Sequence, residues 1–443
     1  MKLRVFFAGD GDCLLLTSGD GRHALIDGGR GTPFVKGPWP VLRGLAEARE
    51  PLDLVVVSHI DADHITGVLW MMRVAAAWAL HDFQSSSPAP SRSREPSTPR
   101  PPEIKRLWHN SWRAQLGELA GPVEAYVTRV AEGLETGTFD VPEGVEPLVD
   151  GFHGLAESIP QGVDLLRVVD DETPVPRNEP FDDLVLLQDP PHVEPLGTTR
   201  LTVLGPAEKH LETLREEWRK WLRTPTGRRA SREEIHTRRD AQGPALGVGG
   251  IDFVEARAAE RAEDEALVGS LLANAAEIIT DADAESVTPP NRASITLLAE
   301  EDGRTCLLTG DAAEDEILEG LEAAGRMSGG RFRCNVLKVQ HHGSEFNLSE
   351  SFAAAVPAEQ YVLCADGAHH NPDPSVVKTI AETRAKDGEP FTLWFNCSPT
   401  RTIPSRRKAL REAIKEAEKA AARHPQITVG VLGDADTCLE ISV

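Results

Sequence analysis

The apolar positions near the N-terminus fall into short runs that predict strands. Runs at 3–7, 13–17 and 23–26 are separated by Gly-Asp and Gly-Gly turns, as in a strand meander. The run 53–58 is almost continuously apolar, which is typical of a strand covered on both faces. Helix-forming apolar residues at 66–80 follow it closely. The pattern therefore predicts a strand, a tight loop and a helix.

The same pattern returns in the second half of the chain. Further strands are expected at 183–187, 200–204, 294–298, 306–309, 336–340, 361–364 and 391–395. The Ala-, Lys- and Glu-rich residues 406–423 predict a helix, and 426–431 with 437–443 predict a closing hairpin. Together the strand-rich pieces amount to about 230 residues, the size of one α/β domain.

Two stretches interrupt this pattern and are expected to be insertions, 81–182 and 206–290. Within the first, residues 85–102 hold six Ser and six Pro, a composition that favours a disordered loop. The second is rich in charge and predicts helices. We therefore expect a single domain over 1–443, with a core formed by about 1–80, 183–205 and 291–443.

Composition and charge narrow the class of protein. The chain has 47 Lys and Arg against 70 Asp and Glu, a net charge of −23, which excludes a generally basic nucleic-acid coat but not a local basic groove. No apolar run approaches ~18 residues, so no transmembrane helix is expected. The N-terminus lacks the apolar core of a signal peptide. The six scattered cysteines are typical of a reduced, cytoplasmic protein.

The strongest chemical signal is the stretch 58–64, which follows a predicted buried strand. Its potential ligands are His59, Asp61, Asp63 and His64. Ligands usually bind beyond the carboxyl ends of strands in α/β proteins, and a strand that ends in a loop can turn alternate side chains toward one point. The alternative is a solvated turn in which Asp63 caps the following helix. Two His and two Asp at this spacing favour a metal site.

Two later predicted strands also end in potential ligands. The run 306–309 leads to Asp311, and the run 336–340 leads to His341 and His342. Taken alone, each of these strand ends has a simpler explanation, because Gly-Asp is common in turns and a single His is often a core residue. Three strand ends that carry His or Asp favour one shared site.

These motifs resemble the metallo-β-lactamase superfamily and, more narrowly, the hydrolase domain of the bacterial DNA-uptake channel protein ComEC and its soluble relatives. The matching motifs, in chain order, are Gly9-Asp10-Gly11-Asp12, Asp27-Gly28-Gly29, His59-x-Asp61-x-Asp63-His64, Asn291-x-x-Ser294, Thr309-Gly310-Asp311, His341-His342-Gly343-Ser344 and Asn371-Pro372-Asp373-Pro374. The resemblance covers the strand-rich core and neither insertion. It implies an α/β protein with the superfamily's four-layered αββα fold.

The resemblance also implies two divalent metal ions. One ion would be bound by His59, Asp61 and Asn291. The other would be bound by Asp63, His64 and one of His341 and His342, with His341 preferred. Asp311 would bridge the two ions. Asp61 and Asn291 stand where the wider superfamily has histidines, so oxygen replaces nitrogen at two positions. Because oxygen-rich sites suit harder ions, we expect Mn²⁺, with Zn²⁺ as the alternative.

A metal pair of this kind predicts a hydrolase that uses a metal-activated hydroxide. Asp63 or Asp311 would orient the water, and His342, if it is not a ligand, would protonate the leaving group or hydrogen-bond a carboxylate. Asp12 and Asp27 are expected either to hydrogen-bond a ligand or to be turn residues, and for Asp27, before two glycines, the turn is favoured. The residues expected to bind substrate are Ser344, His109 and His370.

Phosphodiester hydrolysis is the expected reaction, and it rests mainly on the ComEC resemblance. Single-stranded nucleic acid or nucleotides are the expected substrates. The basic stretches 215–239 and 401–423 can follow a phosphate backbone, although amphipathic helices with solvated charged faces explain them more simply. Two alternatives stay open: hydrolysis of a carboxylic ester, thioester or lactam, and a non-catalytic module that binds a protein partner through insertions 81–182 and 206–290.

Overall fold

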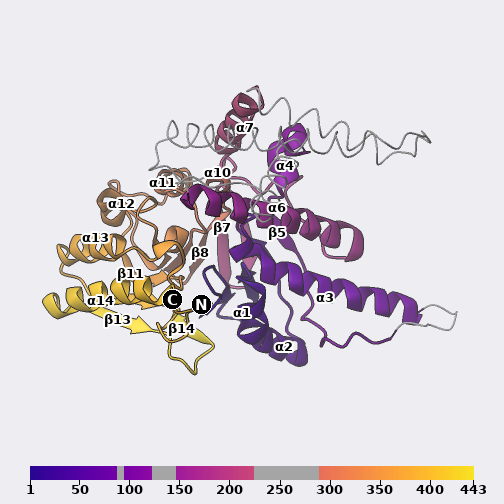
Figure 1. Ribbon diagram of the computed structural model, residues 1–443, viewed down its shortest axis with the longest axis horizontal. Helices are drawn as coiled ribbons and strands as arrows, with labels where there is room; N and C mark the ends of the chain where they lie inside the picture. The colour runs from indigo at the N-terminus through magenta and orange to yellow at the C-terminus, as the bar shows by residue number, and fades with distance from the viewer. Residues whose placement is uncertain (87–93, 122–145, 224–288) are drawn as a thin grey trace, which may run out of the picture. The chain divides into compact units, whose positions relative to one another are not determined.

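The computed structural model describes residues 1–86, 94–121, 146–223 and 289–443 (Figure 1). The chain divides into two compact units. The first consists of Met1–Ser111, Gln161–Leu211 and Val287–Val443, and the second of Trp112–Pro160 and Glu212–Ser286. All strands of the described residues and all candidate metal ligands belong to the first unit.

Six strands of the first unit form one sheet, in the order β14-β1-β2-β3-β4-β5. Their bounds are β1 (Lys2–Phe6), β2 (Leu14–Thr17), β3 (His23–Ile26), β4 (Leu54–Val57), β5 (Leu107–His109) and β14 (Cys438–Ser442). Strands β1 to β3 pair antiparallel, as the predicted meander requires, and β4 runs parallel to β3. Because Ile26 pairs with Val56, the residues that follow β3 and β4 emerge side by side at one edge.

Eight strands form the second sheet, in the order β13-β12-β11-β10-β9-β8-β7-β6. Their bounds are β6 (Val193–Leu196), β7 (Thr199–Gly205), β8 (Thr296–Glu301), β9 (Arg304–Leu308), β10 (Cys334–Lys338), β11 (Ala358–Leu363), β12 (Phe391–Phe395) and β13 (Ile427–Val431). Strands β9 to β13 run parallel to one another. The carboxyl ends of β9 and β10 are therefore neighbours, which brings Asp311 close to His341 and His342.

Apolar side chains of both sheets form a shared core, to which Val5 of one sheet and Leu297 of the other belong. A second core joins the first sheet to α1 (Gly31–Lys36), α2 (Pro38–Ala48) and α3 (Ala62–Ser86). A third joins the second sheet to α11 (Glu314–Ala323), α12 (Glu350–Ala355), α13 (Pro374–Ala385) and α14 (Arg407–Arg423). Figure 1 shows the indigo and the orange-to-yellow helices on opposite sides of the strands. Each fully buried Leu or Val contributes roughly 1.5–3 kcal/mol to stability. The fold is mixed α/β, as predicted.

The remaining described elements are α4 (Trp112–Leu116), η1 (Gly117–Leu119), α6 (Glu146–Glu172), α7 (Glu208–Leu222), α10 (Pro289–Arg292), η2 (Gln340–Gly343) and η3 (Ala368–His370). Helices α6 and α7 each have residues in both units, and Pro160 lies inside α6 at the boundary. Within the second unit, Arg215 Nε donates to the Gln115 carbonyl at 2.6 Å. Among the described residues, no helix combines the length and the hydropathy that crossing a membrane requires.

Three expected elements differ from the structure. Residues 183–187 form no strand, and β6 lies later in the chain. The closing hairpin is wrong, because β13 pairs with β12 whereas β14 pairs with β1 in the other sheet. Strand β5 pairs with β4, so the end of β5 belongs to the first sheet rather than to an insertion. Local apolar patterns locate strands, but they do not say which sheet a strand joins.

The predicted disordered loop 85–102 lies partly outside the described residues. Its described parts are 85–86, which end α3, and 94–102, which form neither helix nor strand and in which Pro101 and Pro102 are buried. Trp78 Nε1 donates to the Thr98 carbonyl at 3.0 Å, which ties this segment to α3. Prolines are already restricted in the unfolded chain, so they lose little entropy on packing. In the predicted helical insertion 206–290, α7 is a charged helix, and 224–288 lie outside the described residues.

Candidate metal centre

The loop after β4 places its histidines in the interior. His59 and His64 are fully buried, and their ring centroids are 4.1 Å apart. Helix α3 begins at Ala62, so Asp63 and His64 lie in its first turn. His59 Nε2 is 3.5 Å from Asp61 Oδ2, and His64 Nε2 is 3.7 Å from Asp63 Oδ2. The loop therefore turns alternating imidazoles and carboxylates toward each other, as the spacing predicts.

Asp27 holds this loop in place through three contacts. Its carboxylate accepts hydrogen bonds from Ser58 N and from Ser58 Oγ, both at 2.7 Å, and from His64 Nδ1 at 3.0 Å. Because Ser58 Oγ donates to Asp27, it accepts from His59 Nδ1 at 3.0 Å. These contacts occupy Nδ1 of both histidines and leave Nε2 to face the other ligands. Asp27 is the predicted turn residue, with φ of 57°, and it also orients two imidazoles.

The glycine-rich turn 9–12 packs directly against this loop. A Cβ atom on Gly11 would lie 1.7 Å from the Asp63 carbonyl oxygen, closer than any two non-bonded atoms can approach. Only glycine fits there without a shift of one backbone or the other. The turn therefore sets the position of Asp63 and brings Asp12 to the same region.

Asp311 follows β9 and lies at the middle of the candidate centre. Its Oδ2 atom faces four imidazole Nε2 atoms, at 3.9 Å for His59, 3.5 Å for His64, 3.9 Å for His341 and 3.2 Å for His342. These contacts join loops that lie far apart in the sequence. The spatial convergence that the sequence predicts is therefore present.

The two adjacent histidines reach Asp311 because their backbone is left-handed. In a strand, neighbouring side chains point to opposite faces. His341 and His342 instead have φ of 45° and 54°, values that few non-glycine residues adopt. His342 Nδ1 donates to the Cys364 carbonyl at 2.8 Å, and His341 Nδ1 donates to Asn347 Oδ1 at 2.7 Å. Both imidazoles therefore turn Nε2 inward.

The Nε2 atoms of the two histidines have different neighbours. His342 Nε2 lies 3.1 Å from Asp63 Oδ2 and 3.3 Å from His64 Nε2. His341 Nε2 instead accepts from Asn291 Nδ2 at 3.3 Å. His342 thus joins the ligands at the start of α3, and His341 joins Asn291 of α10.

The electrostatics of the centre favour positive charge. Burial alone would raise the pKa of Asp311, but His342, His64 and Lys338 lower it well below its usual value. Burial alone would lower the pKa of His64 and of His342, but neighbouring carboxylates, Asp311 foremost, raise both well above the usual value. Similarly, His64 and His342 hold the pKa of Asp63 far below its usual value against the effect of burial. A cluster of carboxylates that stabilises imidazolium cations is also a favourable place for a metal cation.

The donor atoms fit divalent metal ions. His59 Nε2 and Asn291 Oδ1 are buried and have no hydrogen-bond partner among the described residues, an arrangement that is costly unless something binds them. Among the described residues, three groups of side chains have ligand atoms close enough to share an ion: His59 with His64 and Asp311, Asp63 with His64 and His342, and Asp12 with Asp27 and His64. Mixed imidazole and carboxylate donors suit first-row divalent metals.

The three residues expected to bind substrate differ in how deeply they are buried. His109 ends β5, is fully buried and makes no hydrogen bond with either ring nitrogen among the described residues. Ser344 is buried, and its N–H donates to the His341 carbonyl at 2.8 Å. His370 is exposed on η3 with φ of 67°. His370 is thus the only one of the three with an exposed side chain.

Sequence reasoning missed one charged residue of the centre, Lys338. Lys338 ends β10 and is fully buried, with Nζ 2.5 Å from Asp12 Oδ2 and 3.5 Å from Asp311 Oδ1. Burial alone would lower the pKa of Lys338, but the carboxylates of Asp12 and Asp311 raise it above its usual value. A lysine inside the apolar run 336–339 was the available signal, because a charge in such a run needs a partner.

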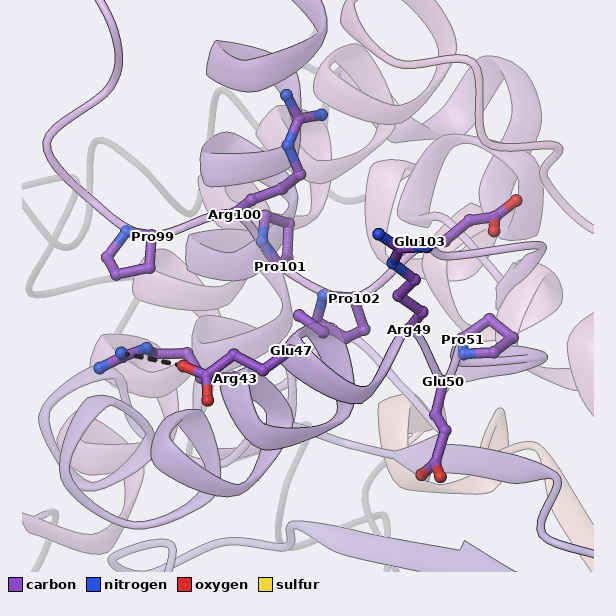
Figure 2. A pocket seen from close by; sticks show the side chains of 11 residues that line it. Arg43, Glu47, Arg49, Glu50, Pro51, Pro99, Arg100, Pro101, Pro102 and Glu103 are labelled. Atoms are coloured by element: carbon purple, nitrogen blue, oxygen red, sulfur yellow. Dashed lines mark hydrogen bonds and ion pairs between the residues drawn. The ribbon is translucent and has the colours of Figure 1, made fainter.

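A surface pocket of about 500 Å³ lies elsewhere in the first unit, between the C-terminal part of α2 and the segment 99–103 (Figure 2). Figure 2 shows the rings of Pro99, Pro101 and Pro102 along this segment, and the ion pair of Arg43 with Glu47 at 3.3 Å on the helix. No candidate metal ligand is among the residues that line it. The side chains of the centre are mostly buried, and those of Asp61 and His341 are partly exposed.

A comparison with known proteins finds a family match that covers the N-terminal ligands of the candidate centre. Residues 7–81 match the family model of the metallo-beta-lactamase superfamily. This stretch contains Asp27, the loop 59–64 and most of α3, and it ends well before Asp311. A search of curated proteins finds no match to the chain. The superfamily that the motifs predict is therefore confirmed over 7–81, and together with the His and Asp clusters it indicates a metal-dependent hydrolase.

Proposed function

We propose that the protein is a metal-dependent phosphodiesterase that acts on single-stranded nucleic acid or nucleotides. The observation that carries the proposal is the position of Asp311, whose Oδ2 atom lies 3.2–3.9 Å from four imidazoles contributed by two loops. A carboxylate in that position can bridge two divalent cations and offset their mutual repulsion. The αββα layering, a ComEC-type origin and a cytoplasmic location belong to the same proposal.

We assign the ligands from the distances between the side chains. His59, Asp61 and Asn291 form one set, because His59 faces Asp61 at 3.5 Å and the Asn291 oxygen has no partner among the described residues. Asp63, His64 and His342 form the other set, because His342 Nε2 lies 3.1 Å from Asp63 and 3.3 Å from His64. This assignment selects His342 over His341 as the ligand. The mixture of nitrogen and oxygen donors supports Mn²⁺ or Zn²⁺.

Bound divalent ions would acidify a water molecule and polarise the phosphoryl oxygens. The chain itself supplies orientation and proton transfer. Asp27 holds the imidazole of His64, and the Cys364 carbonyl holds that of His342, so that neither ring rotates away. Asp63, whose side chain is 17% exposed, orients the attacking water. His341 protonates the leaving oxygen.

Differences in exposure support these roles. The side chains of Asp61 and His341 are 32% and 27% exposed, whereas those of His59 and His64 are 0% exposed. Substrate therefore approaches over Asp61 and His341, and the other ligands lie behind them. A partly exposed imidazole at the rim suits a proton donor to a departing group.

Charge supports a small substrate. The net charge of −23 opposes tight binding of long duplexes, because that binding depends on many Lys and Arg contacts to phosphates. On α14, within the basic stretch 401–423, Lys419 and Arg423 pair with Glu416, and Lys408 pairs with Glu412. These pairs support a solvated charged face there. Most of the other basic stretch, 215–239, lies outside the described residues.

The test uses metal-reconstituted protein and substrates of each class: bis-p-nitrophenyl phosphate, single-stranded DNA, p-nitrophenyl acetate and a chromogenic β-lactam. We expect turnover of the phosphodiesters with Mn²⁺ or Zn²⁺, and its loss in Asp63→Ala. Asp82→Ala, at the exposed far end of the same helix, is the matched control and should retain activity. Turnover of the ester or the lactam alone would favour the alternative hydrolase, and bound metal without any turnover would favour a non-catalytic module.

A further inference from the structure

A buried ammonium group lies beside the candidate ligands and has no ligand role of its own. Lys338 is 0% exposed, and its Nζ atom donates to Asp12 Oδ2 at 2.5 Å and to the Gly310 carbonyl at 2.9 Å. Its third neighbour is Asp311 Oδ1 at 3.5 Å. An unpaired charge is strongly disfavoured in a protein interior, so these oxygens explain how the lysine is tolerated.

Asp12 pairs with this lysine and lies near a candidate ligand. Its Oδ2 atom pairs with Lys338, and its Oδ1 atom lies 3.5 Å from His342 Nδ1. The turn that carries Asp12 is fixed in turn by the close approach of Gly11 to Asp63. Asp12 comes from the turn between β1 and β2 of the first sheet, and Lys338 comes from β10 of the second, so the ion pair joins the two sheets at the centre.

The two oxygens of Asp311 have different partners. Oδ1 faces Lys338, whereas Oδ2 faces the four imidazoles. A carboxylate held at one oxygen by a fixed cation cannot freely rotate about its χ2 angle. The lysine therefore determines which oxygen of Asp311 is presented to the histidines.

We infer that Lys338 and Asp12 form a positioning pair that fixes the Asp311 carboxylate for metal binding, without either residue coordinating the metal. The inference rests on the proposed metal centre. It goes further because it assigns a positioning role to Lys338 and Asp12, which belong to neither ligand set.

If Lys338 acted only through its charge, its removal would change the metal affinity in the opposite direction from that expected of a positioning residue. The positive charge of Lys338 repels a nearby dication, so removing that charge should tighten metal binding if charge alone matters. If the lysine positions Asp311, its removal should weaken metal binding in spite of the lost repulsion. The sign of the change in affinity therefore separates the two roles.

The experiment measures Mn²⁺ affinity by isothermal titration for the full chain and for Lys338→Met, Asp12→Asn and the double variant. Circular dichroism and thermal melting in EDTA establish that each variant is folded. Lys386→Met is the matched control, because it removes the same charge from an exposed lysine that pairs with Glu350. Apparent kcat at saturating Mn²⁺ is the second readout.

We expect Lys338→Met to bind Mn²⁺ roughly 10–100-fold more weakly, as is typical when the partner of a metal ligand is lost, and Lys386→Met to bind like the wild type. The double variant should be no weaker than the weaker single variant, because both substitutions disrupt one unit. If Lys338→Met fails to fold for want of a partner for Asp12, the double variant decides, because it leaves no unpaired charge.

Two results would overturn the inference, and they are distinguishable. Wild-type affinity or tighter in folded Lys338→Met, or in the folded double variant, removes the positioning role and leaves the metal centre standing. A wild-type chain that binds neither Mn²⁺ nor Zn²⁺ removes the metal centre and the positioning role together.

Discussion

In the N-terminal half of the centre, the candidate ligands lie within residues 59–64, whereas in the C-terminal half they follow two different strands or lie in a short helix. The first half is local: one strand end and the first turn of α3 hold all its side chains. The second half depends on the parallel pairing of β9 with β10, which brings Asp311 beside His342.

This difference explains which part of the chain matches a family model. A local loop keeps its spacing in the sequence, and the family match over 7–81 covers that part. The C-terminal ligands are fixed by strand pairing and by the left-handed backbone at His341 and His342, neither of which a short motif records. The chemistry nevertheless needs both halves, because Asp311 contacts side chains of each.

The largest effect is expected from Asp311→Ala, which removes the group shared by both halves. Without a bridging carboxylate, two dications repel each other, so we expect kcat/KM for a phosphodiester to fall on the order of 10³-fold or more. Glu322→Gln, on the exposed side of the following helix, is the control and should leave kcat/KM unchanged. Retention of more than a tenth of the activity by folded Asp311→Ala would show that the halves do not share a metal pair.

The two adjacent histidines should have separable effects within the C-terminal half. His342→Ala removes a ligand and should lower turnover of every phosphodiester by ~10²-fold or more, together with metal affinity. His341→Ala removes a proton donor, which p-nitrophenolate hardly needs, so only substrates with poor leaving groups should slow by ~10²-fold. Steady-state kinetics on bis-p-nitrophenyl phosphate and on a dinucleotide make the comparison. An equal loss on both substrates in His341→Ala would exclude its role as acid.

The N-terminal half should depend on backbone packing. Gly11→Ala places a Cβ atom 1.7 Å from the Asp63 carbonyl, and we expect the free energy of unfolding to fall by about 3 kcal/mol. Gly44→Ala in α2 meets no atom within 4 Å and should be neutral or stabilise by ~0.5–1 kcal/mol. Urea-induced unfolding measures both. Equal stability of the two variants would contradict the close packing of the turn on the metal loop.

The smallest effect concerns Glu316, which follows Asp311 in the C-terminal half. Burial raises the pKa of Glu316 to about 8, despite Arg292 at 3.1 Å. The folded chain then keeps a proton that the unfolded chain loses near pH ~4.5, so this group's stabilisation is full below that pH and decreases as the pH rises toward 8. Glu316→Gln should flatten that decrease in denaturation curves between pH 5 and 8. An unchanged slope would mean that Glu316 is ionised in the fold.

The sequence predicts the strands better than it predicts their partners. The expected runs 23–26 and 391–395 coincide with β3 and β12, because buried strands carry a strong local apolar pattern. The closing hairpin fails because β14 joins β1 at the other end of the chain, a pairing that depends on the shared core between the sheets. No local signal distinguishes the two pairings.

Prediction of the candidate site from the sequence has the same limit, because contacts between distant segments leave no local pattern. The sequence predicts the ligand types and their convergence, since each follows a strand end. It does not reveal that Asp27 orients His64 or that Lys338 pairs with Asp12, because those contacts depend on side-chain directions across two sheets. It also favours His341 over His342 as the metal ligand, whereas the neighbours of the two imidazoles support His342.

The most direct test of the shared centre is elemental analysis of bound metal per chain after reconstitution with Mn²⁺ or Zn²⁺ and removal of the excess. We predict about two ions per wild-type chain, as two-metal hydrolase sites hold, and at most one in Asp311→Ala. A wild-type chain without stoichiometric metal, or an Asp311→Ala variant that retains the full complement, would contradict a centre built jointly by the two halves.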